Sequence, residues 1–258
     1  MQAIESQIIS LYQMLQTSKR TVFFTGAGIS TESGIPDFRS PGGIWTKHKP
    51  ISFQKFVQSK KARRDSWKRK FAVEPMMKNA SPNTGHMAIS KLVESGKANL
   101  VITQNIDGLH QLSGIPETQI VELHGNATYA SCLTCLKKHQ LDTIRNRFVL
   151  DGEPPACQHC GGMVKTATIS FGQPMPEKEM DRAGIETRAC ELFIVVGSSL
   201  VVYPAAGFPI AAKDQGAKLV IINRDATELD HIADLVINAE IGPTLSALID
   251  FRPNEYPV

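Results

Sequence analysis

The stretch that decides the fold is "TVFFTGAGISTESGIPDFR", residues 21–39. Its β-favouring residues run directly into Gly26-Ala27-Gly28. A strand followed by a Gly-x-Gly turn is typical of a dinucleotide-binding fold, because the glycines permit a tight turn and let backbone N–H groups approach a phosphate. The third glycine of that fingerprint is missing, and Thr31 stands in its place. The stretch therefore predicts a dinucleotide-binding strand and turn, but with an incomplete dehydrogenase fingerprint.

Strand and helix patterns alternate along most of the remaining chain. Short apolar runs separated by helices indicate a parallel sheet buried on both faces. The pattern therefore predicts the α/β class, with a doubly wound, parallel, Rossmann-like sheet. After the strand at 21–25, we expect strands at 99–105, 119–125, 192–197, 218–223 and 233–239. We expect helices at 3–17, 83–96, 204–216 and 242–251, with Thr84 as a possible N-cap of the second.

Two segments interrupt this alternation. Residues 40–82 are rich in Lys, Arg, Ser and Pro and contain helical pieces, whereas residues 126–167 hold four of the five cysteines. Each is expected to be an insert on the sheet domain. The predicted division is a Rossmann-like NAD-binding domain at 1–39, 83–125 and 168–258, a helical insert at 40–82, and a small zinc-ribbon module at 126–167.

The overall composition excludes several classes of protein. The chain has 258 residues, of which 42% are hydrophobic and 21% charged, as in an ordinary globular protein. A net charge of +3 is too small to indicate nucleic-acid binding without a concentrated patch. No apolar run reaches the length of a membrane span, and the N-terminus lacks the basic region of a signal peptide, so we expect a cytoplasmic protein.

The cysteines form two Cys-x-x-Cys pairs, Cys132/Cys135 and Cys157/Cys160. Each pair presents two thiolates to one ion, so the two together predict a tetrahedral zinc site. Four thiolates close the coordination shell, and the zinc is therefore expected to be structural. The alternatives are buried or redox cysteines, or a nucleic-acid-binding ribbon, which the lack of interleaved basic and aromatic residues disfavours. The fifth cysteine, Cys190, is expected to be buried and inert.

Polar side chains follow several of the expected strands, at the point where each strand ends. Ligands of open α/β sheets bind at these carboxyl ends. His124, in "ELHG", shares the edge with other polar clusters, which makes a general-base role credible. The other clusters are Gln104, Asn105 and Asp107 of "TQNIDGLH", the "GSS" of residues 197–199, and Asn223.

The loop after the glycine turn, "GIPDFR" at 34–39, is unusual for a plain turn. Proline and glycine stiffen it, and Phe38 is a large apolar residue in a polar loop. Phe38 is interpreted either as a lid over a flat aromatic ligand or as a core anchor. The acidic ribose anchor of dehydrogenases, about 20 residues after the glycines, is also absent from "WTKHKP" at 45–50, which argues against a dehydrogenase.

Taken together, these motifs resemble the sirtuin family of NAD-dependent protein lysine deacylases, of the bacterial type. The matching motifs run in the family's order from residue 21 to about 241. The resemblance implies a deacylase, a deacetylase by default, that transfers the acyl group to ADP-ribose and releases nicotinamide. The motifs are "GAGIS", "GIPDFR", "TQNID", "HG", the two Cys-x-x-Cys pairs, "FG" at 171–172, "GSSLVVYPAA" and "IIN".

The resemblance also implies roles for individual residues around NAD. His124 would act as the base for the ribose hydroxyls, and Asn105 would position ribose and water. Phe38 would shield the reactive face. The full set of expected NAD contacts is Gly26, Ala27, Gly28, Ile35, Asp37, Phe38, Arg39, Gln104, Asn105, Ile106, Asp107, His124, Gly197, Ser198, Ser199, Asn223 and Ile241.

For the second substrate, the resemblance implies an acyl-lysine peptide or protein bound as an added strand. Ile169, Phe171, Gly172 and Val202 would line the lysine channel. Gln173 stands where the family usually has Glu after "FG", which removes a carboxylate near the channel entry.

The basic segment "KKARRDSWKRKF", residues 60–71, bears on the choice of acyl group. It is interpreted either as a solvated helix or as part of the acyl pocket. Family members that remove succinyl or malonyl groups carry a Tyr-x-x-Arg pair, and here Trp67 and Lys70 stand in those places. The segment is more similar to a sirtuin group with Trp and then Arg, here Trp67 and Arg69, which has weak deacetylase activity. We therefore expect Trp67 in the acyl pocket and acetyl as the default substrate. Larger or branched acyl groups stay open, and efficient removal of succinyl is less supported.

Other functions are alternatives to the removal of acetyl groups from lysine. Within the family, the rival is protein mono-ADP-ribosyl transfer or the removal of larger acyl groups. From other classes, the rivals are an NAD-dependent oxidoreductase, which the missing ribose anchor disfavours, and a non-catalytic NAD-sensing or zinc-ribbon interaction protein. The sequence indicates neither the protein target nor the oligomeric state.

Overall fold

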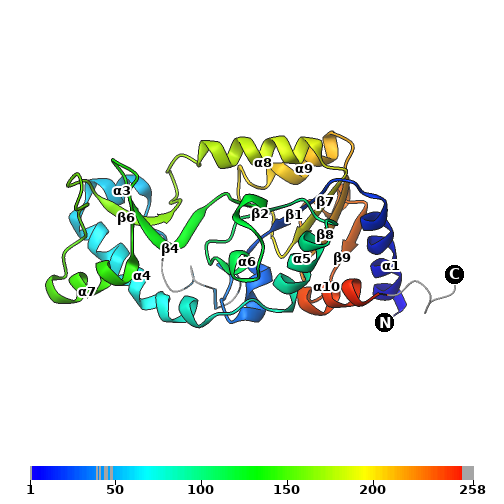
Figure 1. Cartoon of the computed structure of the whole chain (residues 1–258), viewed down its shortest axis with the longest axis horizontal. Helices are drawn as coiled ribbons and strands as arrows, with labels where there is room; N and C mark the ends of the chain where they lie inside the picture. The colour runs from blue at the N-terminus through cyan, green and yellow to red at the C-terminus, as the bar shows by residue number, and fades with distance from the viewer. Residues whose placement is uncertain (1, 39, 41, 44–45, 47–48, 252–258) are drawn as a thin grey trace.

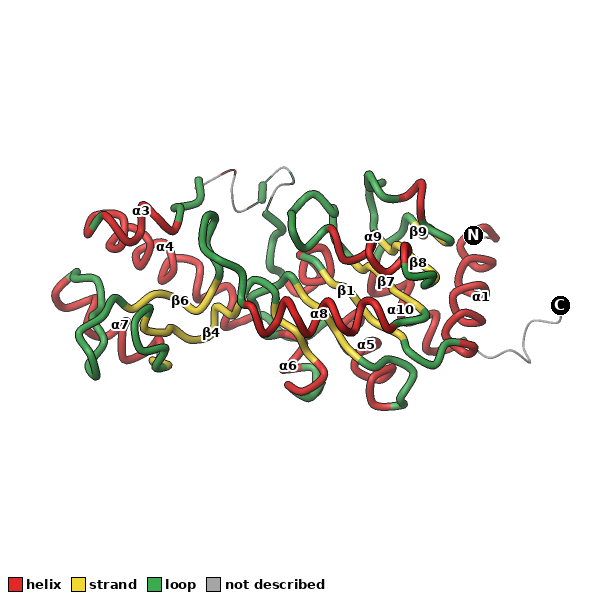
Figure 2. The backbone as a smooth tube through the Cα atoms, turned by 90° about the horizontal axis from the view of Figure 1, so that it is seen from above, coloured by secondary structure: helices red, strands yellow, loops and turns green. Residues whose placement is uncertain are grey.

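The computed structural model describes residues 2–38, 40, 42–43, 46 and 49–251. The molecule is elongated and has two lobes (Figure 1). The larger lobe is built on a six-stranded sheet, and the smaller lobe combines a three-stranded sheet with helices α3, α4 and α7. Seen from above, α8 bridges most of the length of the larger lobe, and β4 and β6 lead out of it into the smaller one (Figure 2).

The large sheet confirms the doubly wound prediction. All its strand pairs are parallel, in the order β3-β2-β1-β7-β8-β9. The strand order reverses between β1 and β7, so that a crevice opens at their carboxyl ends, where ligands of such sheets bind. The strands are β1 Thr21–Thr25, β2 Leu100–Thr103, β3 Ile120–Glu122, β7 Leu192–Val196, β8 Lys218–Ile222 and β9 Leu235–Ile237.

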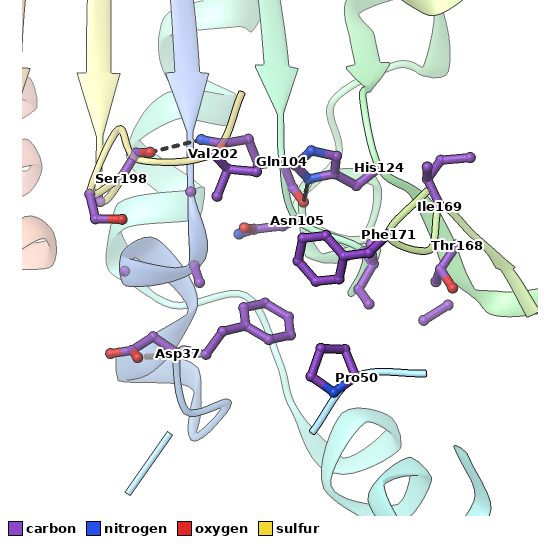
Figure 3. Close-up of a pocket in the computed structure, with 18 of the residues that line it drawn as sticks. Asp37, Pro50, Gln104, Asn105, His124, Thr168, Ile169, Phe171, Ser198 and Val202 are labelled. Atoms are coloured by element: carbon purple, nitrogen blue, oxygen red, sulfur yellow. Dashed lines mark hydrogen bonds between the residues drawn. The ribbon is translucent and has the colours of Figure 1, made fainter. Parts of the chain in front are cut away.

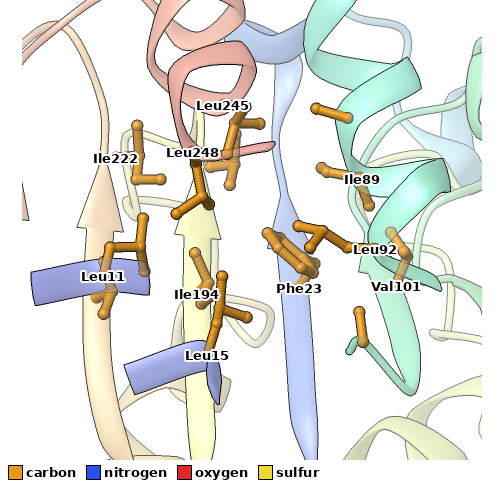
Figure 4. Close-up of a cluster of buried hydrophobic side chains, with 14 of the residues drawn as sticks. Leu11, Leu15, Phe23, Ile89, Leu92, Val101, Ile194, Ile222, Leu245 and Leu248 are labelled. Carbon is orange, nitrogen blue, oxygen red and sulfur yellow. The ribbon is translucent and has the colours of Figure 1, made fainter. Parts of the chain in front are cut away.

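Helices cover both faces of this sheet because successive strand residues point to opposite sides. Phe23 of β1 packs with Leu11, Ile89 and Leu245 on one face (Figure 4). Phe24 of β1 packs into the core on the other face. The first face is covered by α1 Gln2–Thr17, α5 Thr84–Glu94 and α10 Ile241–Asp250, and the second by α8 Glu177–Ala189 and α9 Gly207–Asp214. The described helices include none that is long and apolar enough to cross a membrane.

The smaller lobe joins two segments that are distant in the sequence. Its antiparallel sheet has the order β5-β4-β6, and Trp67 and Phe71 of α4 pack against Cys132, Phe148 and Cys157. The helical insert and the cysteine module therefore share one hydrophobic core. The elements are α3 Phe53–Gln58, α4 Lys60–Asn79, β4 Gly125–Cys132, β5 Lys138–His139, α7 Leu141–Asp151 and β6 Val164–Thr168.

The boundaries of some elements differ from the prediction. The second predicted helix begins at Thr84, but its N-cap is Asn83, whose Oδ1 accepts hydrogen bonds from the amides of Gly85 and His86. The assignment of Thr84 as N-cap was therefore wrong by one residue. The helix predicted at 204–216 begins only at Gly207. The remaining short elements are the helix α6 Leu109–Leu112 and three 3₁₀ helices, η1 Ala27–Ser33, η2 Glu117–Gln119 and η3 Asp230–Ile232.

Candidate functional site

A cavity of about 650 Å³ lies at the carboxyl ends of the parallel strands and extends to residues of the smaller lobe. In the view of Figure 3, His124, Asn105 and Phe171 lie on one side of it, and Asp37 and Pro50 lie on the other. The structure thus brings most of the predicted site residues together. Those that line the cavity are Gly26, Ala27, Gly28, Asp37, Phe38, Gln104, Asn105, Ile106, His124, Ile169, Phe171, Gly172, Gly197, Ser198, Ser199, Val202, Asn223 and Ile241.

Two described residues that were predicted to bind NAD, Ile35 and Asp107, are not found in this lining. Ile35 packs with Ala80 and Leu109 in a small hydrophobic cluster. Asp107 is buried, and its Oδ2 accepts a hydrogen bond from Ser30 Oγ. Arg39 lies outside the described residues.

The glycine turn is shaped by a contact between two loops. Gly26 N–H donates to the carbonyl of Val196 (3.0 Å), and Gly28 N–H donates to the carbonyl of Gly197 (2.8 Å). A Cβ on Gly26 would lie 2.6 Å from the Gly197 oxygen, and one on Gly197, where φ is 64°, would lie 2.5 Å from the Ile29 nitrogen. Only glycine allows this approach. The amides of Gly26 and Gly28 therefore bond within the fold, while the turn itself lines the cavity.

The turn then continues into η1 rather than into a long helix. Thr31, which replaces the third glycine of the fingerprint, donates from Oγ1 to the carbonyl of Gly28 (2.8 Å). The 3₁₀ helix ends at Gly34, whose φ of 82° is left-handed. No long helix packs against the sheet at this point, so the third glycine of the fingerprint has no structural role to fill.

The imidazole of His124 is oriented by the backbone of the neighbouring strand end. Its Nδ1 lies 3.0 Å from the carbonyl oxygen of Gln104. A carbonyl oxygen only accepts hydrogen bonds, so Nδ1 carries the proton and Nε2 of the neutral ring is the basic nitrogen. The Gln104 side chain in turn donates to Ser198 Oγ (2.8 Å; Figure 3). The ends of β2, β3 and β7 are thereby tied together around a potential general base.

A buried serine, Ser30, organises the amide and carboxylate beside His124. Asn105 Nδ2 donates to Ser30 Oγ (3.1 Å), and Ser30 Oγ donates to Asp107 Oδ2 (2.7 Å). Burial raises the pKa of Asp107, and hydrogen bonds from the Leu109 amide and from Ser30 oppose that rise. Ser30 was not among the predicted site residues, although it lies inside "GAGIS" and is a polar residue that the glycine turn carries into the core.

Two lysines of the smaller lobe also line the cavity. Lys70 was placed from the sequence at one position of the family's acyl-binding pair, whereas Lys165 was not among the predicted site residues. Lys165 of β6 is 3% exposed and donates from Nζ to the carbonyls of Thr166 and Thr168. Burial lowers its pKa to about 8. Lys70 of α4 donates from Nζ to the carbonyl of Ala127 (2.8 Å), and burial lowers its pKa as well.

Trp67 does not lie in the described lining of the cavity. Its side chain is 2% exposed and packs in the core of the smaller lobe, beside Phe71 and the cysteines. This corrects the prediction that Trp67 forms the acyl pocket. Successive helix residues are about 100° apart, and α4 turns a different stripe to the cavity. That stripe consists of Ser66, Arg69, Lys70, Val73 and Met77.

The four predicted metal ligands converge in the smaller lobe. Their sulfur atoms all lie within 4.8 Å of one another, with Cys132–Cys160 at 3.5 Å and Cys135–Cys157 at 3.7 Å. A tetrahedral zinc with Zn–S bonds of about 2.3 Å requires S···S edges of about 3.8 Å, so the cluster fits the metal. The amides of Cys135 and Thr134 donate to the Cys132 sulfur and lower its pKa to about 6, which favours the thiolate ligand. Cys190, by contrast, is buried, and burial raises its pKa to about 11, as expected of an inert thiol.

Comparison with known proteins identifies relatives over nearly the whole chain. A family model described as "Sir2 family" matches residues 26–204. An "NAD-dependent protein deacetylase 1" of Bradyrhizobium diazoefficiens is 56% identical over 246 residues, which covers 95% of this chain and 96% of the relative. An "NAD-dependent protein deacetylase" of Rhodopseudomonas palustris is 53% identical and covers 96% of this chain and 98% of the relative.

Among solved structures, a similar one is a Sir2 protein bound to a deacetylated peptide and an acetyl-ADP-ribose. It superposes with a TM-score of 0.85 at 35% sequence identity, covering 94% of this chain and 97% of the other. Similarity therefore extends over both lobes and the cavity.

Proposed function

Because the chain belongs to the Sir2 family, we propose that it is an NAD-dependent protein lysine deacylase and that the cavity beside His124 is its active site. The observation that carries this proposal is the Nδ1 hydrogen bond of His124 to the Gln104 carbonyl, which makes Nε2 a base at the cavity. Its relatives are named NAD-dependent protein deacetylases, and a similar structure holds the deacetylated peptide beside acetyl-ADP-ribose. Acetyl-lysine is the default substrate.

NAD serves as a co-substrate. The acyl oxygen bonds to the ribose carbon that carries nicotinamide, and nicotinamide leaves as a neutral base with the electrons of the broken glycosidic bond. The acyl group ends on ADP-ribose. The residues of this chain bind and orient the reactants. His124 Nε2 takes the proton from a ribose hydroxyl, which turns that oxygen into a nucleophile. Asn105, held by Ser30, orients the ribose and a water. Phe38 covers the reacting face and keeps bulk water out.

The remaining site residues divide between the two substrates. The small-residue turn of Ser198 and Ser199, with Asn223 and Ile241, holds the adenosine half of NAD. The acyl-lysine enters between the lobes and passes Ile169, Phe171, Gly172 and Val202. All of these residues line the same cavity, which supports their assignment to the two substrates.

Zinc has a structural role in this proposal. Four cysteine sulfurs occupy all positions of a tetrahedral ion, so it activates no water. Cys132 and Cys157 lie in the core that also holds Trp67, so the metal would stabilise the lobe that carries part of the cavity.

We also propose that the protein works in the cytoplasm. The proposed domains are the Rossmann-like domain at 1–39, 83–125 and 168–258, the helical insert at 40–82, and the zinc module at 126–167. The absence of a membrane-spanning helix among the described residues is compatible with that location. The antiparallel strands β4 and β6 run from Gly125 to Thr168, which supports the bounds of the zinc module to within one residue.

A panel of acyl-lysine peptides incubated with NAD, read by mass spectrometry, tests the proposed activity. Deacylation predicts peptides lighter by the acyl group, with free nicotinamide and an O-acyl-ADP-ribose. A peptide or protein heavier by one ADP-ribose would identify a mono-ADP-ribosyltransferase instead. Appearance of the absorbance of reduced cofactor would identify an oxidoreductase. No NAD-dependent mass change on any peptide would contradict the proposal.

A further inference from the structure

The loop that follows β2 carries Asn105 into the cavity and ends at His110. His110 lies on α6, is 2% exposed, and is not in the described lining of the cavity. Its Nε2 lies 2.9 Å from Oγ1 of Thr25, the last residue of β1. At the other end of the loop, the Asn105 amide donates to Oγ1 of Thr103, the last residue of β2 (3.0 Å). Both ends of this loop therefore bond to threonine hydroxyl groups of the sheet.

The two threonines connect these ends to each other. Thr25 and Thr103 are paired across the parallel strands, and Thr25 Oγ1 donates to Thr103 Oγ1 (2.8 Å). The single proton of the Thr25 hydroxyl is used in that bond, so Thr25 accepts from His110 and Nε2 carries the ring proton. A continuous chain of buried hydrogen bonds thus leads from His110 through two hydroxyl groups to the amide of Asn105.

The backbone of Thr25 also supports the general base. The Gln104 amide donates to the carbonyl of Thr25 (2.9 Å), and the Gln104 carbonyl accepts from Nδ1 of His124 (3.0 Å). Figure 3 shows Gln104, Asn105 and His124 at the ends of neighbouring strands. A displacement of Thr25 would therefore move both the base and the residue that orients the ribose.

The surroundings of His110 fit a fixed, uncharged donor. Burial lowers its pKa to about 3 and the pKa of the neighbouring His86 to about 4, so both rings are neutral at pH 7. The two ring centroids lie 5.1 Å apart, and His86 is itself bonded to Asn83 at the start of α5. Nδ1 of His110 has no hydrogen-bond partner among the described residues, which leaves the ring its bond to Thr25.

An apolar side chain would fill the position of His110 at lower cost, because burying a polar ring is unfavourable unless it is hydrogen-bonded. The bond to Thr25 is what distinguishes the imidazole from such a side chain.

We propose that His110 is a positioning residue for deacylation, which acts through Thr25 and Thr103 to hold the loop from which Asn105 orients the ribose and a water. This inference rests on the proposed deacylase function and adds a residue from outside the cavity lining. The position requires a neutral N–H donor. Its loss should lower kcat rather than weaken NAD binding, because the turns assigned to the adenosine half follow other strands.

The experiment measures steady-state kinetics with an acetyl-lysine peptide, and NAD affinity by calorimetry, on the whole protein. His110→Leu removes the donor, and we expect kcat to fall by about tenfold while NAD affinity stays within about twofold of wild type. His110→Gln should keep kcat within about threefold of wild type, because its amide nitrogen lies as many bonds from Cα as the imidazole Nε2 and also donates.

A double-mutant cycle tests whether His110 acts through Thr25. Thr25→Val removes the hydroxyl at nearly the same shape and should also lower kcat by about tenfold, and His110→Leu combined with Thr25→Val should show no further loss. Thr187→Val is the matched control and should retain the wild-type kcat. Thr187 is a fully buried residue of α8, and its hydroxyl has no hydrogen-bond partner among the described residues. Thermal unfolding verifies that each variant is folded before its kinetics are compared.

The outcomes separate this inference from the function on which it rests. Wild-type turnover with an unchanged kcat in folded His110→Leu overturns the positioning role and leaves the deacylase standing. If His110→Leu does not fold, an unchanged kcat in Thr25→Val overturns it instead.

Three further results also overturn the positioning role. They are losses that multiply to about a hundredfold in the double variant, a His110→Gln variant as slow as His110→Leu, and weaker NAD affinity with unchanged kcat. Absence of turnover by the wild-type protein overturns the deacylase function, and the inference with it.

Discussion

The imidazole Nδ1 of His124 and the backbone carbonyl of Gln104 lie 3.0 Å apart, and the side chain of the same glutamine bonds to Ser198. One residue thus fixes the tautomer of the base and links it to the turn after β7. The base is oriented by a backbone atom, which no side-chain substitution at Gln104 removes.

Replacing the base tests its role directly. His124→Ala should lower kcat for acetyl-lysine by about 10²–10⁴-fold, the usual contribution of a positioned general base. NAD affinity, measured by calorimetry, should change little, because the turns that hold the adenosine half are intact. A variant that retains at least a third of wild-type kcat would show that His124 is not the base.

Ser30 connects two functional side chains, so its loss should affect the site more than the fold. Ser30→Ala leaves Asp107 with one donor fewer in a buried position, which costs about 1–3 kcal/mol of unfolding free energy and raises the pKa of Asp107 further. It also frees the Asn105 amide, and kcat should fall. Urea unfolding and steady-state kinetics measure the two effects. Ser10→Ala, which removes only an exposed intrahelical bond, is the control and should change neither by a measurable amount.

The metal can be tested without measuring activity. The purified protein should contain one zinc per chain, and Cys157→Ser should lose it and unfold at lower temperature, because the binding energy of a structural zinc is folding energy. Cys190→Ser is the matched control, since Cys190 is buried far from the cluster and its thiol donates only to the Thr187 carbonyl. Zinc content by atomic absorption that is equal in the two variants would refute the four-cysteine site.

Trp67 should behave as a core residue. Trp67→Ala is expected to lower the unfolding free energy by about 3–5 kcal/mol, as for other buried aromatic truncations. Trp67→Phe should cost less, because Nε1 has no hydrogen-bond partner among the described residues and no bond is lost. The ratio of acetyl to butyryl turnover should be the same in Trp67→Phe as in the wild type. A changed ratio with unchanged stability would restore Trp67 to the acyl pocket.

Lys165 should lower stability at neutral pH. Burial holds its pKa at about 8, below the ordinary 10.5, so below pH 8 the folded state carries the full cost of a desolvated ammonium, about 3 kcal/mol. Between pH 8 and 10.5 the unfolded chain keeps a proton on Lys165 that the folded chain has released. The contribution of Lys165 to the free energy of unfolding of the wild type therefore rises with pH in this range. Lys165→Met removes that cost and loses hydrogen bonds of about 1 kcal/mol each.

The expected result is a Lys165→Met variant that is more stable than wild type by about 1 kcal/mol at pH 7, with the advantage gone by pH 10. Urea unfolding at the two pH values measures the difference, and Lys68→Met, a change at an exposed lysine of α4, should show no difference at either. A Lys165→Met variant that is less stable than wild type at pH 7 would contradict this prediction and show that the fold stabilises the ammonium group.

Much of the large lobe could be predicted from local pattern. The run "TVFFT" and the other β-branched segments formed parallel strands as predicted, because a strand buried on both faces needs apolar residues at every position. Errors came at the ends, where Asn83 rather than Thr84 caps its helix. Either residue is a good cap, and the choice depends on which backbone amides lie beside it.

The prediction for α4 failed at a different level. The helical pattern of residues 60–71, with its seven basic residues, predicts a helix. It does not predict which side of that helix packs against another part of the protein. The zinc module supplies that partner, and it draws Trp67 into its core and leaves Lys70 at the cavity. The burial of Lys165 could not be found from its neighbours in the sequence, because it is set by the tertiary packing around β6.

The sequence by itself determined the sheet, the glycine turn, the four metal ligands and the polar residues at the strand ends, because these depend on backbone propensity, ligand chemistry and the parallel sheet that gathers strand ends at one edge. The tertiary structure decided what those residues do. It assigned the amides of Gly26 and Gly28 to a contact between turns, gave His124 its tautomer and placed Lys70 and Lys165 at the cavity. Each depends on the distance between atoms remote in the sequence, which only the packing of two lobes sets.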